Sequence, residues 1–248
     1  MSVPIIVSQM FSSFPQVSFG LSTRLGGVSP EPFGMNLSFN VGDDRIKVMQ
    51  NRRIFLKSLQ ITGDQLAVPR QNHGDTVKVV ERSGEYQGCD GLVTNKPGVF
   101  LSVSIADCLP VFFFDPSSES IAAVHAGWRG CVQKIVQKAV TKMVAEFSTK
   151  PETLMAYIGP SARVCCYEVG EEVASRFDQK FLSHNTGTRP HLDMKSFTVS
   201  LLKEIGVADS HIEISQYCTM CAAEFFHSYR RDGASSGRMM GVIGLRRY

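Results

Sequence analysis

The chain has 248 residues, a formal net charge of +3, 43% hydrophobic residues and 20% charged residues. This composition is typical of a globular protein, and the near balance of charge gives no basic footprint for nucleic acid. No apolar run reaches the roughly 18 residues of a membrane span, and the N-terminus shows no export signal, so neither membrane nor nucleic acid is an expected partner. The same features predict a cytoplasmic protein with reduced cysteines.

The N-terminal part of the chain predicts a strand followed by a glycine-rich loop. Residues 16–23 alternate apolar and polar side chains, as a half-buried strand does, and Arg24 follows directly. The flexible backbone of the loop would let Arg24 contact an anionic or planar ligand. A turn with a solvated arginine explains the composition equally well, so the residues alone leave both interpretations open.

The central stretch, residues 101–130, holds a thiol and an imidazole, each at the end of an apolar run. Strand-like runs at residues 101–106, 111–114 and 120–124 place Cys108 and His125 at neighbouring strand ends. A polar loop upstream, residues 71–75, precedes another strand-like run and contributes His73. A cysteine and two histidines from three strand ends can form a zinc site with an open fourth position, which is the catalytic form of such a site.

The residues of this centre also allow other interpretations. Cys108 and His125 suit a cysteine hydrolase, because a thiolate beside an imidazolium is a good nucleophile, although His73 favours the metal site. An isolated cysteine or histidine is often only part of the core. The turn after His125 contains Arg129 and opens a helix, whose free N–H groups would suit an anion.

The order of the remaining elements predicts one domain of mixed α/β type. Helices are expected over residues 45–59, 131–147, 171–181 and 194–205, and further strands over residues 76–81, 89–94, 154–158, 212–215 and 240–245. The first helix is expected to begin at Asp43 or Asp44, with Ile46, Met49 and Phe55 on its apolar side.

The other cysteines carry weaker signals. Cys165 and Cys166 are interpreted as structural, because adjacent cysteines point apart on an extended chain. Residues 211–213 with Cys218 and Cys221 superficially match the cytidine-deaminase zinc signature, but the proline of that signature is missing and the separation is too short. A C-x-x-C pair alone can bind zinc or act in redox chemistry, and no second ligand pair is evident from the sequence.

Taken together, the motifs resemble those of the bacterial laccase-domain family, which is also described as polyphenol-oxidase-like or YfiH-type and whose members are now regarded as purine nucleoside phosphorylases. The resemblance covers nearly the whole chain, as a single domain over residues 1–248. It is carried by Thr23-Arg24-x-Gly26-Gly27-Val28-Ser29, Asn36-Leu37-Ser38, Gly42-Asp43, Gln71-x-His73-Gly74, Ala106-Asp107-Cys108-Leu109-Pro110, His125-Ala126-Gly127-Trp128-Arg129-Gly130, Ile158-Gly159-Pro160, Cys166-Tyr167-Glu168-Val169-Gly170 and Tyr229-Arg230-Arg231-Asp232-Gly233.

This resemblance implies an α/β/β/α layered sandwich with mixed sheets, similar to cysteine hydrolases. It implies an enzyme that cleaves adenosine, inosine, guanosine and methylthioadenosine with phosphate, and that deaminates adenosine in the same pocket. His73, Cys108 and His125 match the family's zinc ligands and are the expected catalytic residues. The substrate-binding residues are expected to be Arg24, Asn36, Gln71, Arg129 and Tyr167.

Two other classes of protein fit the sequence less well. The family's older name implies a multicopper oxidase, but copper clusters use His-x-His pairs, and the six histidines of this chain include none. Copper is therefore expected only as an adventitious occupant of the zinc site. A non-catalytic binding protein is disfavoured, because a purely structural sheet has no need for so many polar residues at strand ends. Nothing in the sequence requires more than a monomer.

Overall fold

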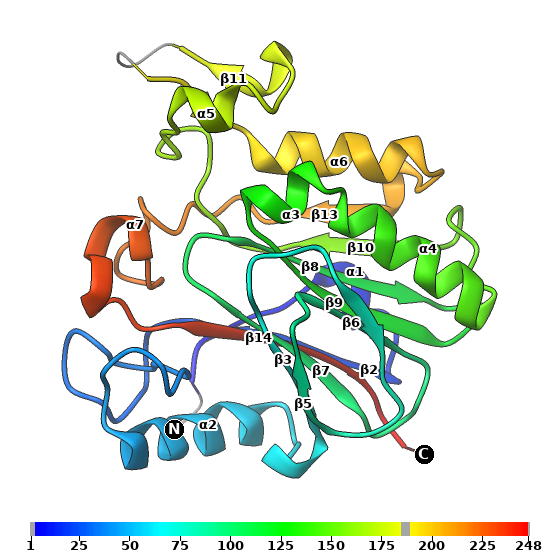
Figure 1. Ribbon diagram of the computed structural model, residues 1–248. Coiled ribbons are helices and arrows are strands. Elements are labelled where there is room, and N and C mark those ends of the chain that lie inside the picture. Colours follow the sequence, from blue (N-terminus) through cyan, green and yellow to red (C-terminus); the bar gives the residue numbers. More distant parts are fainter. Residues whose placement is uncertain (1–2, 185–188, 248) are drawn as a thin grey trace.

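The computed structural model describes residues 3–184 and 189–247. Two six-stranded mixed sheets stack face to face, and helices cover the outer face of each (Figure 1). The predicted α/β/β/α layered sandwich is confirmed. Among the described residues, no helix combines the length and apolar character needed to cross a bilayer.

The last strand of the chain lies in the middle of the first sheet. Its order is β1 (Ile5–Ile6), β2 (Val17–Ser22), β14 (Met239–Leu245), β7 (Phe100–Ile105), β3 (Leu66–Arg70) and β5 (Gly84–Gln87). Strand β14 runs antiparallel to both of its neighbours, so the C-terminal residues lie between segments from the first half of the chain. Helix α2 (Arg45–Ser58) covers the outer face (Figure 1).

The second sheet carries the central stretch of the sequence. Its order is β13 (Ile212–Ile214), β10 (Met155–Ile158), β8 (Leu109–Asp115), β9 (Ser120–Ala126), β6 (Gly91–Thr94) and β4 (Val77–Val79). Helices α4 (Ile135–Phe147) and α6 (Met194–Glu204) cover its outer face (Figure 1). A small sheet of β11 (Leu182–Ser183) and β12 (His191–Leu192) lies beyond them. The short helices are α1 (Gln9–Ser12), α3 (Trp128–Val132), α5 (Glu171–Ala174) and α7 (Tyr229–Asp232).

Strand alternation divides the apolar side chains of β8 between two cores. Val111 and Phe113 pack against α4, whereas Phe112 and Phe114 pack between the sheets. Successive side chains of a strand point to opposite faces, so a strand buried on both sides reads as a continuous apolar run. The antiparallel register pairs Pro110 of β8 with His125 of β9. This register brings the end of β9 beside the residue that precedes β8.

Two of the predicted helices are interrupted. The helix expected over residues 131–147 starts earlier, as α3, and restarts as α4 because Lys134 adopts a left-handed conformation with φ of 58°. The helix expected over residues 171–181 consists of α5 and a separate 3-10 turn, Gln179–Phe181, because the backbone of Asp178 is extended. Strands β3 and β5 were not predicted, since Pro69 and Gly84 weaken the strand pattern.

Helix α2 buries only part of the side predicted for it, because Phe55 is buried but two other predicted residues are not. It begins at the predicted cap Asp44, but Ile46 and Met49 are 68% and 43% exposed. The buried side instead carries Asn51, whose amide accepts from the N–H of Val28 and donates to carbonyl groups of Gly34 and Asn36. The pattern of apolar residues does not reveal this buried side, because Asn51, a polar residue that hydrogen-bonds to a loop, occupies one of its positions.

Candidate active site

The three predicted metal ligands come together at one edge of the sheets. Cys108 precedes β8, His125 lies on β9, and His73 lies in the loop after β3. One ligand atom from each residue lies within 4.8 Å of the other two, and the two imidazole rings are edge to face with centroids 4.9 Å apart. His125 and Cys108 are neighbours because of the β8–β9 register, and His73 approaches from the other sheet.

Asp90 connects two of these ligands. Its Oδ1 lies 2.8 Å from Nδ1 of His125, and its carboxylate accepts the backbone N–H groups of Asn72, His73 and Gly74 at 2.9–3.1 Å. The carboxylate is fully buried. A hydrogen bond to Nδ1 fixes the tautomer, so Nε2 of His125 is the atom available to a metal. Asp90 therefore orients one ligand and holds the loop that carries another.

Two residues of the site have backbones that L-amino acids rarely adopt. His73 and Asp107 have φ angles of 60° and 89°. The Asp107 carboxylate accepts hydrogen bonds from the hydroxyls of Thr219 and Ser228 and from the N–H of Arg230. Unusual dihedrals persist only where surrounding contacts impose them, and they cluster at functional sites. The contacts of Asp107 thus fix the residue that immediately precedes Cys108.

Electrostatics favour a charged Cys108–His125 pair in the metal-free protein. Burial by itself raises the pKa of the Cys108 thiol, but the His125 charge and hydrogen bonds from both histidines outweigh it and lower that pKa to about 6. Burial likewise lowers the pKa of His125, but the Cys108 charge and the Asp90 hydrogen bond raise it to about 9. A thiolate and a neighbouring imidazolium stabilise each other, and the thiolate is also the form that binds metal.

Alkylation of metal-free protein tests this ion pair. The thiolate is the reactive form, so iodoacetamide should label Cys108 with a half-maximal rate near pH 6. Cys108 loses its stabilising charge as pH falls through about 6, and His125 loses its charge as pH rises through about 9, so the pair is stabilising between these values. His125→Gln should raise the pH at which Cys108 alkylation reaches half of its maximal rate. Peptide mass spectrometry at each pH follows Cys108 alone, and a wild-type midpoint near 9 would contradict the ion pair.

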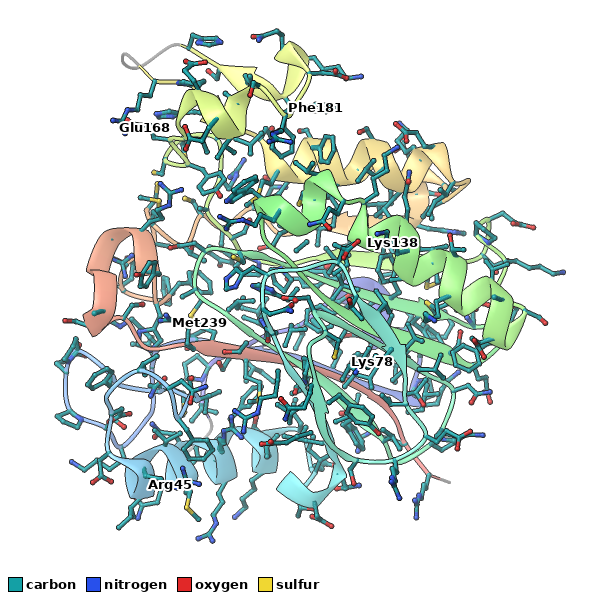
Figure 2. The ribbon with its side chains drawn as sticks, in the orientation of Figure 1. Arg45, Lys78, Lys138, Glu168, Phe181 and Met239 are labelled. Carbon is teal, nitrogen blue, oxygen red and sulfur yellow. The ribbon has the colours of Figure 1, made fainter. Side chains whose placement is uncertain are left out.

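The three ligands open into a cleft of about 770 Å³. It is bounded by the start of α2, the ends of β3 and β7, α3, α7 and the segment before β14. Helix α7 and the start of α2 lie on the same side of the sheets (Figure 1), and Figure 2 shows Arg45 at that end of α2. The lining includes four aromatic and five arginine side chains: Phe39, Trp128, Tyr167, Tyr229, Arg45, Arg52, Arg70, Arg230 and Arg238.

Two of the five predicted substrate-binding residues line this cleft. They are Gln71, whose amide is paired with the backbone of Ser104, and Tyr167, whose ring lies 4.9 Å from the Arg230 guanidinium. The other three lie outside the lining. Arg24 binds Glu31 and backbone carbonyls, and Arg129 is exposed against the ring of Trp128.

The third residue outside the lining, Asn36, supports a residue within it. Asn36 is fully buried, and its Oδ1 accepts the backbone N–H of Arg238 at 3.0 Å. Asp90, Asp107 and Arg238 were not predicted from the sequence as residues of the site. Asp107 could have been predicted, because it precedes Cys108 in a recognised motif. Asp90 and Arg238 could not, because they join the site only when distant segments of the chain pack together.

Comparison with known proteins assigns the chain to a family. A family model described as multi-copper polyphenol oxidoreductase laccase matches residues 18–246. The chain belongs to this family. A purine nucleoside phosphorylase of Deinococcus radiodurans is 39% identical over 235 residues, which cover 93% of this chain and 90% of that protein. Adenosine deaminase RL5, from an unknown prokaryotic organism, is 34% identical over 223 residues, or 83% and 84% of the two chains.

Solved structures of the laccase family share the fold. The crystal structure of the hypothetical protein YfiH from Bacillus licheniformis matches with a TM-score of 0.92 and 29% identity, over 98% of this chain and 96% of that one. The likeness therefore extends to both sheets and their covering helices. Together with the curated relatives, it identifies this laccase-family member as an enzyme.

The ligand set of this laccase-family member fits one metal ion. Two imidazoles and a thiolate are zinc ligands, and three protein ligands leave a position open for water or substrate. A side chain at Gly127 would lie 3.4 Å from both Cys108 Sγ and His73 Cδ2, so the glycine leaves room beside the ligands. Among the described residues, no other histidine joins this set, although a multicopper cluster would require several.

Proposed function

We propose that this enzyme is a purine nucleoside phosphorylase that also deaminates adenosine, with zinc held by His73, Cys108 and His125. The observation that carries the proposal is the position of this three-ligand set, which opens into a cleft lined by aromatic and arginine side chains. Such a cleft can receive a planar base and an anion together. The printed names of relatives, purine nucleoside phosphorylase and adenosine deaminase, support both activities.

Aromatic side chains would recognise the purine. Phe39, Trp128, Tyr167 and Tyr229 offer faces on which a flat heterocycle can stack. Burial raises the pKa of Tyr167 to about 12, so its hydroxyl stays protonated at neutral pH and can donate a hydrogen bond. Adenosine, inosine, guanosine and methylthioadenosine share the purine face, and the aromatic lining alone does not rank them.

Arginine side chains would place the phosphate. Arg238 lines the cleft and is positioned by Asn36, whereas Arg129 lies outside the lining, on α3. An anion held beside the anomeric carbon becomes more strongly stabilised as that carbon gains positive character. We assign the principal phosphate contact to Arg238, and supporting roles to Arg230, which also lines the cleft, and to Arg129.

The two activities use different features of the site. A zinc ion with an open position lowers the pKa of bound water to about 7, which is the chemistry that deamination needs. Asp90 keeps His125 in the tautomer that presents Nε2, and it holds the loop of His73. Phosphorolysis in turn depends on the arginine side chains, which bring phosphate to the sugar.

Product analysis tests the proposal. Purified, metal-quantified protein is incubated with adenosine, with and without phosphate, and the products are separated by chromatography. Phosphate-dependent adenine and ribose-1-phosphate are the expected phosphorylase products, and phosphate-independent inosine is the expected deaminase product. Recovery of unchanged adenosine, inosine, guanosine and methylthioadenosine from protein with an occupied His73–Cys108–His125 site would rule the proposal out.

The same assay distinguishes the two arginines. Arg238→Ala should raise the KM for phosphate roughly 10-fold or more, with a smaller change in the KM for adenosine, because one charge-assisted contact contributes about 1.5–3 kcal/mol. Arg129→Ala is the matched comparison and should have a smaller effect on the phosphate KM. The reverse order of effects would assign the phosphate to Arg129 on α3.

A second candidate function follows from the charged Cys108–His125 pair. A thiolate beside an imidazolium can attack esters or amides, as in a cysteine hydrolase. The arrangement fits this chemistry only in the metal-free protein, since the thiolate would otherwise be a zinc ligand and not a free nucleophile. Ester and amide hydrolysis that rises when zinc is removed would favour this candidate, and hydrolysis that is absent in both forms would eliminate it.

A further inference from the structure

Four cysteines from two distant segments meet outside the active site. Cys165 and Cys166 lie in the loop between β10 and α5, and Cys218 and Cys221 lie in the loop between β13 and α7. All four Sγ atoms lie within 4.8 Å of one another. The second ligand pair that the sequence did not reveal is therefore present. We propose that these four cysteines bind one zinc ion as a structural site, separate from the His73–Cys108–His125 set.

The sulfur geometry favours a metal over a simple core contact. Cys221 Sγ lies 3.7 Å from Cys165 Sγ and 3.1 Å from Cys166 Sγ. Four sulfurs around zinc at about 2.3 Å stand about 3.8 Å from one another. Cys165 and Cys221 are exposed, so they contribute little to a hydrophobic core and leave a path for the metal to enter.

The backbone around the cluster is organised independently of the sulfurs. Ser161 and Cys218 form a parallel bridge that continues the pairing of β10 with β13, and the N–H of Thr219 donates to the carbonyl of Ser161. On the other segment, the N–H groups of Cys166 and Tyr167 both donate to the carbonyl of Arg163, which makes a turn. This turn brings Cys165 and Cys166 to the same centre, although an extended chain would have separated them.

A buried lysine lies beside one of the two cysteine-bearing loops. The Lys195 side chain is almost fully buried, and its Nζ donates to the carbonyl groups of Ser215 and Tyr217, close to Cys218 in the chain. Within the described parts of the chain, no carboxylate forms an ion pair with it. Buried charges are ordinarily paired, and zinc with four thiolates carries a net double negative charge.

The position of the cluster suggests what the metal would stabilise. Tyr167, which lines the active-site cleft, follows Cys166 directly. Thr219, which lies between the other two cysteines, donates a hydrogen bond to Asp107 beside Cys108. A metal at the cluster would tie together two loops, one that carries a lining residue of the cleft and one that contacts a lining residue, and this role is independent of the proposed nucleoside chemistry.

Metal analysis of full-length variants tests the proposal. Zinc is measured by inductively coupled plasma mass spectrometry after growth and purification without chelators. Wild-type protein and the control Cys131→Ala, which removes a buried cysteine outside both groups, should hold about two zinc ions per chain. Cys108→Ala and Cys221→Ala should each hold about one zinc ion. Zinc X-ray absorption should show a shell of sulfur alone at about 2.3 Å in Cys108→Ala, and a mixed nitrogen and sulfur shell in Cys221→Ala.

Three outcomes would overturn the four-cysteine site. The first is a zinc content in Cys221→Ala equal to that of wild type, and the second is a Cys108→Ala protein without zinc. The third is a Cys166–Cys221 disulfide in freshly purified protein, seen as a mass lower by two hydrogens. If Cys221→Ala does not fold, cobalt loading of Cys108→Ala decides the question, because only a thiolate-rich site gives intense sulfur-to-cobalt charge-transfer absorption.

Discussion

Replacing Cys108 with alanine is expected to empty the His73–Cys108–His125 site and to lower nucleoside turnover by roughly 10²- to 10⁴-fold. The variant leaves only two imidazoles to hold the metal, and it also removes the thiolate that faces both histidines. Steady-state turnover of adenosine, measured beside zinc content, checks the result. The fold should survive, because Cys108 lies outside β8 and is partly exposed.

The matched control for this change is Cys131→Ala. Cys131 is a fully buried cysteine on α3, outside both groups of ligands, so its loss should leave turnover and zinc content near wild type. Circular dichroism would check that both variants are folded. If Cys108→Ala kept wild-type turnover, Cys108 would no longer belong to the catalytic site.

Replacing Asp90 with asparagine is expected to weaken zinc binding at the active site by roughly 10- to 100-fold. The same change should lower the free energy of unfolding by about 1.5–3 kcal/mol, since charge-assisted hydrogen bonds to His125 and to three backbone N–H groups are lost or weakened. Competition with a chromophoric chelator measures the affinity, and urea unfolding measures the stability.

Asp75→Asn is the comparison for Asp90→Asn, because Asp75 lies in the same region but forms a surface ion pair with Lys138. Surface pairs contribute little, so both measurements should remain close to wild type.

Burial alone would raise the pKa of Asp90, but its hydrogen bonds to His125 and to the loop lower the pKa below 3.8. Its stabilisation is therefore complete above that value and is lost as pH falls through the lower, folded-state value. Equal zinc affinity in Asp90→Asn and wild type would show that Asp90 only supports the loop.

Local signals predicted the reactive centre because its residues stand at strand ends. Cys108 and His125 were found from two apolar runs and a turn, and the antiparallel register then makes them neighbours. Asp90 gave no such signal, since its carboxylate acts on residues 16 to 35 positions away in the chain. The motif-level resemblance supplied the layered fold, which strand patterns alone do not determine.

The four-cysteine group shows where local reasoning fails. Cys165 and Cys166 were interpreted from an extended backbone, but the hydrogen bonds to Arg163 turn the chain and bring both sulfurs to one centre. Similarly, Lys134 breaks a continuous apolar helix pattern by adopting a left-handed conformation. Such single-residue conformations leave little trace in periodicity, because they arise from tertiary packing.

The separation of the proposed ligands His73, Cys108 and His125 along the chain has a consequence for how the protein folds. None of them is close to another in the chain, and they meet only after β8 pairs with β9 and Asp90 joins the loop of His73 to β9. The unfolded chain therefore has no preformed version of this site. Zinc bound there should stabilise the folded chain against unfolding, and the gain in the free energy of unfolding should grow with the zinc concentration.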